Sequence, residues 1–502
     1  MVFDNLSVGR YLIKETDAPK YVYTKIEPFF VDIPRGNATG DGWNYNITVE
    51  LKNTTIYANV ICTVKNTENV VLTGATFKLQ KENKSSLETD KYEDYVFDSI
   101  QNLFTTNSEG KFTINYLEAG KYRLVELSSQ EGYIVDQSNP EYFEITLRED
   151  GVDLNIEIIN EKVTLNQYVI SDNGADIKNR GVNTTRHYTY EDLASWKITA
   201  TVPSMISKME TFEIYDEVDP SLQLKEDTIR VYGIKNNVET LLTKNTNFLL
   251  GNKYNTDSIY QDMKITFINL DLIKDYDSIA IKYDTYIQPR YNNTIDTYGT
   301  DYKNEAHISY TDKIDKDRDE IHRYTSEPTA NSTANVHTGR LVFLKTDGTR
   351  GLGDAEFKIA ATEQDARNGN FLNFGYENYT MYSYSDGMVY FWGLAYGDDD
   401  ETAANGSTDY WIVETQAPSY EDENGNTQYY NLLKEPVRVT VNATSGNYVE
   451  GVSTKIINRK NFELPATGTI GMLVFTLIGI TLIIIAVILN KKEKKNVQNN
   501  KK

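Results

Sequence analysis

The stretch Tyr410-Trp411-Ile412-Val413-Glu414-Thr415-Gln416-Ala417-Pro418 decides the fold, because it recurs along the chain. Earlier copies read Tyr11-Leu12-Ile13-Lys14-Glu15-Thr16-Asp17-Ala18-Pro19 and Tyr122-Arg123-Leu124-Val125-Glu126. In each copy tyrosine, an aliphatic residue and glutamate alternate, which predicts a β-strand with a carboxyl on its apolar face. A buried carboxyl is costly unless it is paired or protonated, so its recurrence indicates a role beyond solvation.

The composition favours an all-β chain of several domains. The 502 residues suffice for three or four domains, and the 37 tyrosines with abundant threonine, valine and isoleucine favour strands. A net charge of −22, from 51 basic and 73 acidic residues, argues against binding to nucleic acid. Cys62 is the only cysteine, so no intrachain disulfide can form. The chain must therefore be stabilised by packing or by another cross-link.

The C-terminus predicts a single membrane span. Leu464-Pro465-Ala466-Thr467-Gly468 precedes an apolar run over residues 470–489 and a tail rich in lysine. About twenty residues at ~1.5 Å each cross the roughly 30 Å hydrocarbon core of a bilayer. By the positive-inside rule the lysines remain cytoplasmic, so everything upstream is exported and the pentapeptide lies just outside the membrane.

This C-terminal stretch resembles the cell-wall sorting signal that sortases of Gram-positive bacteria read. The resemblance implies that a sortase cysteine cleaves between Thr467 and Gly468 and holds the threonine carbonyl as a thioester until an amine takes it. It also implies a secreted protein that ends in the cell wall, bound to peptidoglycan, after a single-pass membrane intermediate. An ordinary membrane anchor with a chance LPATG sequence is the alternative.

The recurring strand resembles the E-box of Cna-B-like domains, which are immunoglobulin-like β-sandwiches of Gram-positive surface proteins. The resemblance implies tandem Cna-B-like and Cna-A-like sandwiches in an elongated array, followed by a transmembrane helix. We expect a truncated N-terminal pilin domain (1–54), a Cna-B-like domain (55–162) and a central Cna-A-like domain (163–337). A C-terminal Cna-B-like domain (338–461) and the sorting segment (462–502) follow. The first copy begins at residue 3 and no signal peptide precedes it, so we expect a fragment or a mis-called start.

Residues 42–53 alternate as Trp43, Tyr45, Ile47, Val49 and Leu51, which predicts a half-buried strand. The segment resembles the pilin motif of sortase-assembled backbone pilins, although Glu50-Leu51-Lys52-Asn53 stands where that family usually has Tyr-Pro-Lys-Asn. The resemblance implies that the Lys52 amine attacks the thioester of the next subunit. The alternative is an exposed lysine of an edge strand.

Two sets of lysine, glutamate and asparagine match the order of intramolecular isopeptide sites in Cna-B-like domains. The resemblance implies the sets Lys65–Glu126–Asn160 and Lys345–Glu414–Asn458. Burial lowers the pKa of a lysine and raises that of a carboxyl, so a neutral amine could attack the asparagine carbonyl while the acid shuttles protons. The alternative for each set is a buried lysine–glutamate ion pair with a bystander asparagine.

In the central domain, the strands around residues 212–218 and 302–310 resemble those of backbone pilins. The resemblance implies Asp216 and Asn304 as the acid and the asparagine of a third site. Gln167 stands where the family has lysine and carries no nucleophilic amine. We therefore predict no cross-link in this domain, although Lys162 is nearby.

The sequence predicts no metal, no cofactor and no enzymatic activity. Asp315-x-Asp317-x-Asp319 mimics a calcium loop, but Glu320 replaces the glycine that the sharp turn needs, so a solvated loop is expected. The four histidines and Cys62 form no recognisable catalytic triad.

Together these features resemble a SpaA-type backbone (major) pilin, the shaft subunit of a sortase-assembled pilus. The resemblance implies subunits joined through Thr467 of one and Lys52 of the next. The expected partners are a pilin-specific sortase, further copies of the chain, minor pilins and peptidoglycan, with membrane contact before cleavage and a role in surface adhesion. The alternative is a wall-anchored adhesin or accessory pilin in which Lys52 is inert.

Overall fold

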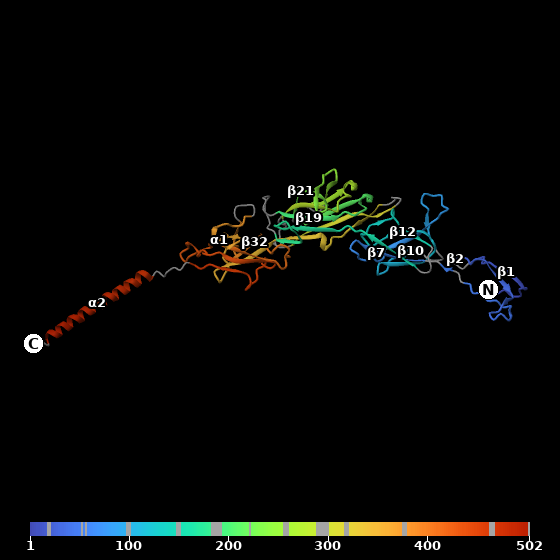
Figure 1. The fold of residues 1–502 in the computed structure, drawn as a ribbon. Helices are drawn as coiled ribbons and strands as arrows, with labels where there is room; N and C mark the ends of the chain where they lie inside the picture. Colours follow the sequence, from blue (N-terminus) through green and yellow to red (C-terminus); the bar gives the residue numbers. More distant parts are fainter. Residues whose placement is uncertain are drawn as a thin grey trace. The chain divides into compact units, whose positions relative to one another are not determined.

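The computed structural model describes residues 1–17, 22–51, 54–55, 58–96, 102–146, 152–181, 193–219, 222–254, 261–287, 301–315, 321–373, 379–460 and 467–499. Its contacts divide the chain into two units, of which the first comprises Met1–Arg180, Leu193–Gln288 and Tyr302–Val336. The second is built around the residues from His337 onward. Strands dominate both units (Figure 1), which confirms the predicted all-β class.

The N-terminal residues form three small antiparallel pairs. Strand β1 (Gly9–Ile13) pairs with β3 (Phe29–Ile33). Strand β2 (Val22–Thr24) pairs with β6 (Thr54–Thr55), and β4 (Arg35–Gly36) pairs with β5 (Trp43–Asn44). The predicted strand over residues 43–51 is wrong beyond Asn44, because no described strand pairs with residues 45–51. Trp43 is 70% exposed and Leu51 is 51% exposed. Lys52 lies outside the described residues.

Residues 58–160 form a β-sandwich whose first and last strands run parallel. One sheet has the order β11-β7-β15, with strands at Lys111–Leu117, Ala58–Asn66 and Val152–Asn160. The other has the order β10-β8-β12-β14, with β9 beside β8, and its strands are Leu103–Thr105, Thr76–Glu82, Gly120–Ser128, Glu141–Ile145 and Tyr92–Asp94. Alternate residues of β7 face the core, because strand side chains point in turn to opposite faces. Val60, Cys62 and Val64 are fully buried there.

The central part of the first unit consists of two larger sheets. The order β18-β28-β26-β20-β24-β23 describes one, with strands Asn179–Gly181, Thr333–His337, Asp301–Ile314, Phe212–Val218, Gln261–Phe267 and Phe248–Tyr254, and with β27, His322–Thr325, beside β26. The order β17-β16-β19-β25-β21-β22 describes the other, with strands Asp176–Ile177, Leu165–Ile170, Ala194–Thr201, Ser278–Ile287, Leu222–Lys235 and Val238–Leu241. Three 3-10 helices, η1, η2 and η3, lie at Ile206–Lys208, Leu270–Leu272 and Ala330–Ser332. Trp196, Phe212 and Ile281 are among the fully buried side chains.

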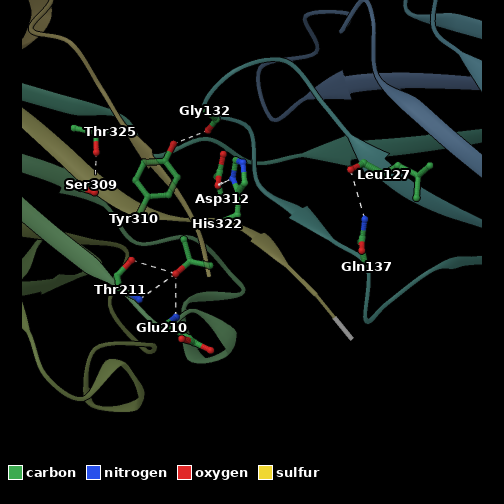
Figure 2. A network of polar contacts seen from close by, with 11 residues as sticks. Leu127, Gly132, Gln137, Glu210, Thr211, Ser309, Tyr310, Asp312, His322 and Thr325 are labelled. Carbon is green, nitrogen blue, oxygen red and sulfur yellow. Dashed lines mark hydrogen bonds and ion pairs between the residues drawn. The ribbon is translucent and has the colours of Figure 1, made fainter. Parts of the chain in front are cut away.

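A short strand joins the first sandwich to the central sheets. Strand β13, Val135–Asp136, leaves the sandwich and pairs in parallel with the end of β26. Nearby, the buried Tyr310 hydroxyl donates to the Gly132 carbonyl at 2.5 Å (Figure 2). Strand addition therefore connects two sandwiches within the first unit.

The second unit repeats the arrangement of the first sandwich. One sheet has the order β32-β29-β37, with strands Met388–Leu394, Gly339–Thr346 and Lys455–Ile457, and its β29 and β37 run parallel. The facing sheet has the order β31-β30-β33-β36, with strands Thr380–Tyr382, Glu356–Ala360, Ser407–Gln416 and Val437–Asn442. A hairpin, β34 and β35, lies at Ser419–Glu421 and Thr427–Tyr429, and helix α1 lies at Glu363–Asn368.

The last element that the structure describes is helix α2, Thr467–Asn499. Within it, Phe475–Lys492 has a mean hydropathy of 1.9 and is long and apolar enough to cross a membrane. This confirms the predicted C-terminal apolar helix.

Candidate functional site

The structure brings Lys345, Glu414 and Asn458 together inside the second unit. Lys345 on β29 has no exposed surface, and Glu414 on β33 and Asn458 just after β37 are 2% and 1% exposed. The Lys345 ammonium lies 2.9 Å from Glu414 Oε1 and donates to Asn458 Oδ1. Asn458 Nδ2 donates to both oxygens of Glu414, at 2.8 and 2.9 Å. The carboxyl thus contacts both the amine and the amide nitrogen.

Apolar surroundings favour a neutral amine at this position. Burial lowers the pKa of Lys345, and the neighbouring Glu414 opposes that shift only in part. Phe343 and Phe357 are fully buried in the same core, and the Phe357 ring centre lies 5.7 Å from Lys345 Nζ. A proton can pass from the amine to Glu414 across their contact, which leaves a nucleophile beside the amide of Asn458.

The first sandwich holds a glutamate and an asparagine at the corresponding place, but not the expected lysine. Asn160 Nδ2 donates to Glu126 Oε1 at 2.7 Å and to Ser129 Oγ at 2.8 Å. The predicted placement of Lys65 beside this pair is wrong. Lys65 points away from the core and forms an ion pair with Glu157 at 2.5 Å.

Val64, rather than Lys65, occupies the place of Lys345. The Val64 carbonyl accepts from the Leu72 amide at 2.9 Å, as the Lys345 carbonyl accepts from Leu352 at 2.9 Å. Val64 lies opposite Ile158, two residues before Asn160, just as Lys345 lies opposite Ile456, two residues before Asn458. Because strand side chains alternate, the one-residue offset turns Lys65 to the outer face and puts a valine in the core.

Because of the buried Glu126 carboxyl, we expect the stability of the first sandwich to depend on pH. Burial raises its pKa from 4.5 to about 7, although Asn160 and Ser129 donate to it. The folded state therefore binds this proton more tightly than the unfolded state. The resulting stabilisation is complete below pH 4.5 and is lost as the pH rises through about 7. It amounts to something on the order of 3 kcal/mol, at about 1.4 kcal/mol per pKa unit.

Hydrogen-exchange mass spectrometry of the full chain between pH 4.5 and 8 measures this effect in residues 102–146. Relative to Glu126→Gln, the wild-type segment should open more readily as the pH rises. Glu157→Gln, on the exposed side of β15, is the matched control and should behave as wild type. Equal pH dependence in wild type and Glu126→Gln would contradict the assignment.

In the central sheets, Gln167 lies beside Asp216 and Asn304, as the sequence predicts. All three side chains are fully buried. Gln167 Nε2 donates to Asp216 Oδ1 at 2.8 Å and to the Tyr283 hydroxyl at 3.0 Å. Tyr283 donates to Asp216 Oδ2 at 2.5 Å and lies 2.7 Å from the side-chain amide of Asn304. Burial raises the pKa of Asp216 to about 7.

Tyr283 is the residue of this network that the sequence reasoning missed. It lies on β25 at an inward position, two residues after Ile281. That alternation is visible in the sequence, but 37 tyrosines give it no prominence. Among the described residues, no group of three or more histidine, cysteine, aspartate or glutamate side chains is placed to hold a metal ion.

The predicted sorting signal and its partner lysine lie mostly beyond what the structure describes. Leu464, Pro465 and Ala466 fall outside the described residues, as does Lys52. The backbone of Thr467 and Gly468 begins helix α2.

Two family models match parts of the chain. Residues 59–162 match SpaA, a prealbumin-like fold domain, and residues 458–497 match the Gram-positive LPXTG cell wall anchor motif. No curated protein is matched by sequence. The anchor motif with its apolar helix is that of a cell-wall-anchored surface protein with a membrane intermediate.

Several solved structures of major pilins align with this chain, and one of them aligns closely enough to show a shared fold. The full-length major pilin SpaD from Corynebacterium diphtheriae aligns with a TM-score of 0.52 and 16% identity, over 81% of this chain and 98% of that chain. BcpA, the major pilin subunit of Bacillus cereus, aligns with a TM-score of 0.47 and 20% identity, over 81% of this chain and all of that chain. This chain therefore carries a SpaA-type prealbumin-like domain and an LPXTG cell wall anchor motif, on the fold of a major pilin.

Proposed function

We propose that the chain is a shaft subunit of a covalently polymerised pilus and serves attachment at the cell surface. The observation that carries the proposal is the LPXTG anchor motif at the end of a chain with the fold of a full-length major pilin. The chain acts as the substrate of a sortase and not as an enzyme. Its partners are that sortase, further copies of itself, minor pilins and, at the base, peptidoglycan.

The joining reaction uses one residue at each end of the chain. The sortase cysteine attacks the Thr467 carbonyl, the bond to Gly468 breaks, and a thioester forms. The Lys52 amine of another copy then attacks that carbonyl, so an isopeptide bond replaces the thioester and the cysteine is released. Helix α2 holds Thr467 at the membrane until cleavage, and leaves with Gly468.

We also propose an internal isopeptide bond between Lys345 and Asn458. The neutral Lys345 amine attacks Cγ of Asn458, a carbon–nitrogen bond forms, and the amide nitrogen leaves as ammonia after taking a proton from Glu414. Support comes from the 2.9 Å contact of Glu414 with the amine and from its two contacts with the leaving nitrogen. The same reaction is unavailable at Val64 and at Gln167, because neither side chain has an amine.

Lys52→Ala tests the polymer. In cells that contain the sortase, ladders of high molecular weight should disappear, because no other amine takes the thioester. Lys25→Ala, an exposed lysine of the same segment, is the matched control and should leave the ladders intact. Immunoblots of cell-wall extracts report both. Undiminished ladders in Lys52→Ala would contradict the proposal and favour an adhesin or accessory pilin in which Lys52 is inert.

A further inference from the structure

The two complete sandwiches share a segment that meets different surroundings in each. In the first, Tyr133 bridges to Lys162 and the Ile134 amide donates to Glu161 at 2.9 Å. In the last, the same pattern recurs at residues 430–431: Tyr430 bridges to Lys460, and the Asn431 amide donates to Arg459 at 2.9 Å. Residues 134–137 and 431–434 are therefore equivalent places in the two sandwiches.

In the first sandwich this segment is a docking element. Ile134 and Val135 are only 2% and 4% exposed. Val135 and Asp136 pair with β26, and the Gln137 amide donates to the Ile314 carbonyl at 3.0 Å. Figure 2 shows the side chain of Gln137 donating to the Leu127 carbonyl of the first sandwich, at 3.5 Å. Strand addition and apolar burial thus fasten this sandwich to the next one along the chain.

In the last sandwich the equivalent segment is ordered but uncovered. Leu432 is 47% exposed, and Tyr429 just before it is 57% exposed. No strand pairs with residues 432–434 in the part of the chain that the structure describes. The Leu433 amide donates to Glu414 Oε2 at 2.9 Å, so the buried carboxyl holds the segment in place. A preformed edge with an exposed leucine is suited to strand addition, since little ordering is needed on binding.

We propose that residues 429–434 dock onto a second copy of this chain by the strand addition that β13 makes within the chain. The inference rests on the proposed function, because the joint at Thr467 would bring the second copy to this edge. Thr467 follows Lys460, the bridge partner of Tyr430, by seven positions, and a stretch of that length reaches at most about 25 Å. A partner tethered so closely has an effective concentration on the order of mM, so even a weak contact forms.

The second copy offers a matching edge in its N-terminal segment. There β3 pairs with β1 alone among the described strands, and Phe30 on β3 is 64% exposed. Strands β14 and β36, which follow the recurring glutamate strand in the complete sandwiches as β3 does, also lie at the edges of their sheets. The open edge of β3 is therefore a general property of this position, and we assign it as the acceptor.

The test uses the full chain in detergent micelles, without sortase, at concentrations up to about 1 mM. The photoreactive residue p-benzoylphenylalanine is placed at Tyr429, and an isotope-labelled second copy identifies intermolecular adducts by mass spectrometry. Adducts should map to residues 22–36 of the labelled copy. Leu432→Asp should lower their yield at least about tenfold, because a charge would replace the apolar side chain that docking buries. The photoreactive residue at Val452, which is 82% exposed in the same sandwich, is the matched control and should give none.

The two proposals fail in different ways. Adducts that are absent, that map elsewhere, or that ignore Leu432→Asp overturn the docking edge, whatever the sortase ladders show. Ladders that persist in Lys52→Ala overturn the covalent joint, whatever the adducts show. Docking without sortase would stand on its own as an interaction between copies.

Discussion

Glu414→Ala is expected to leave Lys345 and Asn458 unjoined. The wild-type chain should be lighter than its sequence mass by one ammonia, and the variant should have its full sequence mass. Without the carboxyl, no group takes the proton from the amine or returns it to the leaving nitrogen. The lost bond closes a loop of 113 positions, and loops of about this length contribute about 4–5 kcal/mol in the loop-entropy model.

Two further variants separate chemistry from folding. Lys345→Met removes the nucleophile but keeps an unbranched apolar side chain, so it should also retain the ammonia and melt at a lower temperature. Lys455→Met removes a partly exposed lysine on β37, near Asn458, and should be cross-linked as in wild type. Intact mass and a joined peptide pair after proteolysis report the bond. Identical mass deficits in wild type and Glu414→Ala would exclude this role for the glutamate.

Val64→Lys is expected to install a second cross-link in the first sandwich. A lysine there would stand where Lys345 stands in the last sandwich, with Glu126 and Asn160 already in contact at 2.7 Å. The variant should lose one more ammonia than wild type. Closing a loop of about 100 residues should stabilise the sandwich by about 4–5 kcal/mol in the same model. Intact mass and hydrogen exchange in residues 58–160 measure the two effects.

The controls for this gain of function use the same strand. Val64→Met fills the site without an amine and should show no mass deficit. The double variant Val64→Lys with Glu126→Gln should keep its ammonia and bury an unpaired amine, which costs several kcal/mol. Adding Lys65→Ala to Val64→Lys should change nothing, because Lys65 faces outward. No extra mass deficit in Val64→Lys would show that Glu126 and Asn160 are not competent for the reaction.

Composition and strand alternation sufficed to predict the all-β class, whereas the grouping of the second unit's polar residues was implied by the resemblance to Cna-B-like domains. In the structure Lys345 and Glu414 lie at inward positions of β29 and β33, and Asn458 follows β37, so the three side chains meet in the core. The resemblance to backbone pilins also put Gln167 at the lysine position of the central domain, and in the structure Gln167 donates to Asp216. A strand that alternates cleanly specifies which side chains share the interior.

The error at Lys65 arose because the lysine was matched by residue type, without asking which face of the strand its position occupies. Val60, Cys62 and Val64 alternate in the sequence as the inner face, which already excludes Lys65 from it. At residues 45–51, by contrast, the alternation was followed correctly but the predicted strand does not form. Their alternation is clean, but a strand also needs a hydrogen-bonding neighbour, and among the described residues none pairs with them.

The docking of β13 could not be foreseen from local pattern. Val135 and Lys313 are paired across 178 positions of sequence. A strand of two residues is also too short to show an alternating pattern of apolar and polar residues. The Tyr310–Gly132 contact is equally remote in sequence. Such pairings depend on how complete sandwiches meet, which no single stretch encodes.

The parallel pairing of first and last strands determines how each sandwich carries tension. Pulled at its ends, a parallel pair is sheared, so its hydrogen bonds resist together and do not open one by one. In the first sandwich nine residue pairs of β7 and β15 would share that force with no covalent bond between them. In the last, the proposed isopeptide bond would carry force entering β29 from Lys345 to Asn458, so that the force bypasses the residues between them. The last sandwich would then be inextensible, and the first would yield before it and lengthen under load.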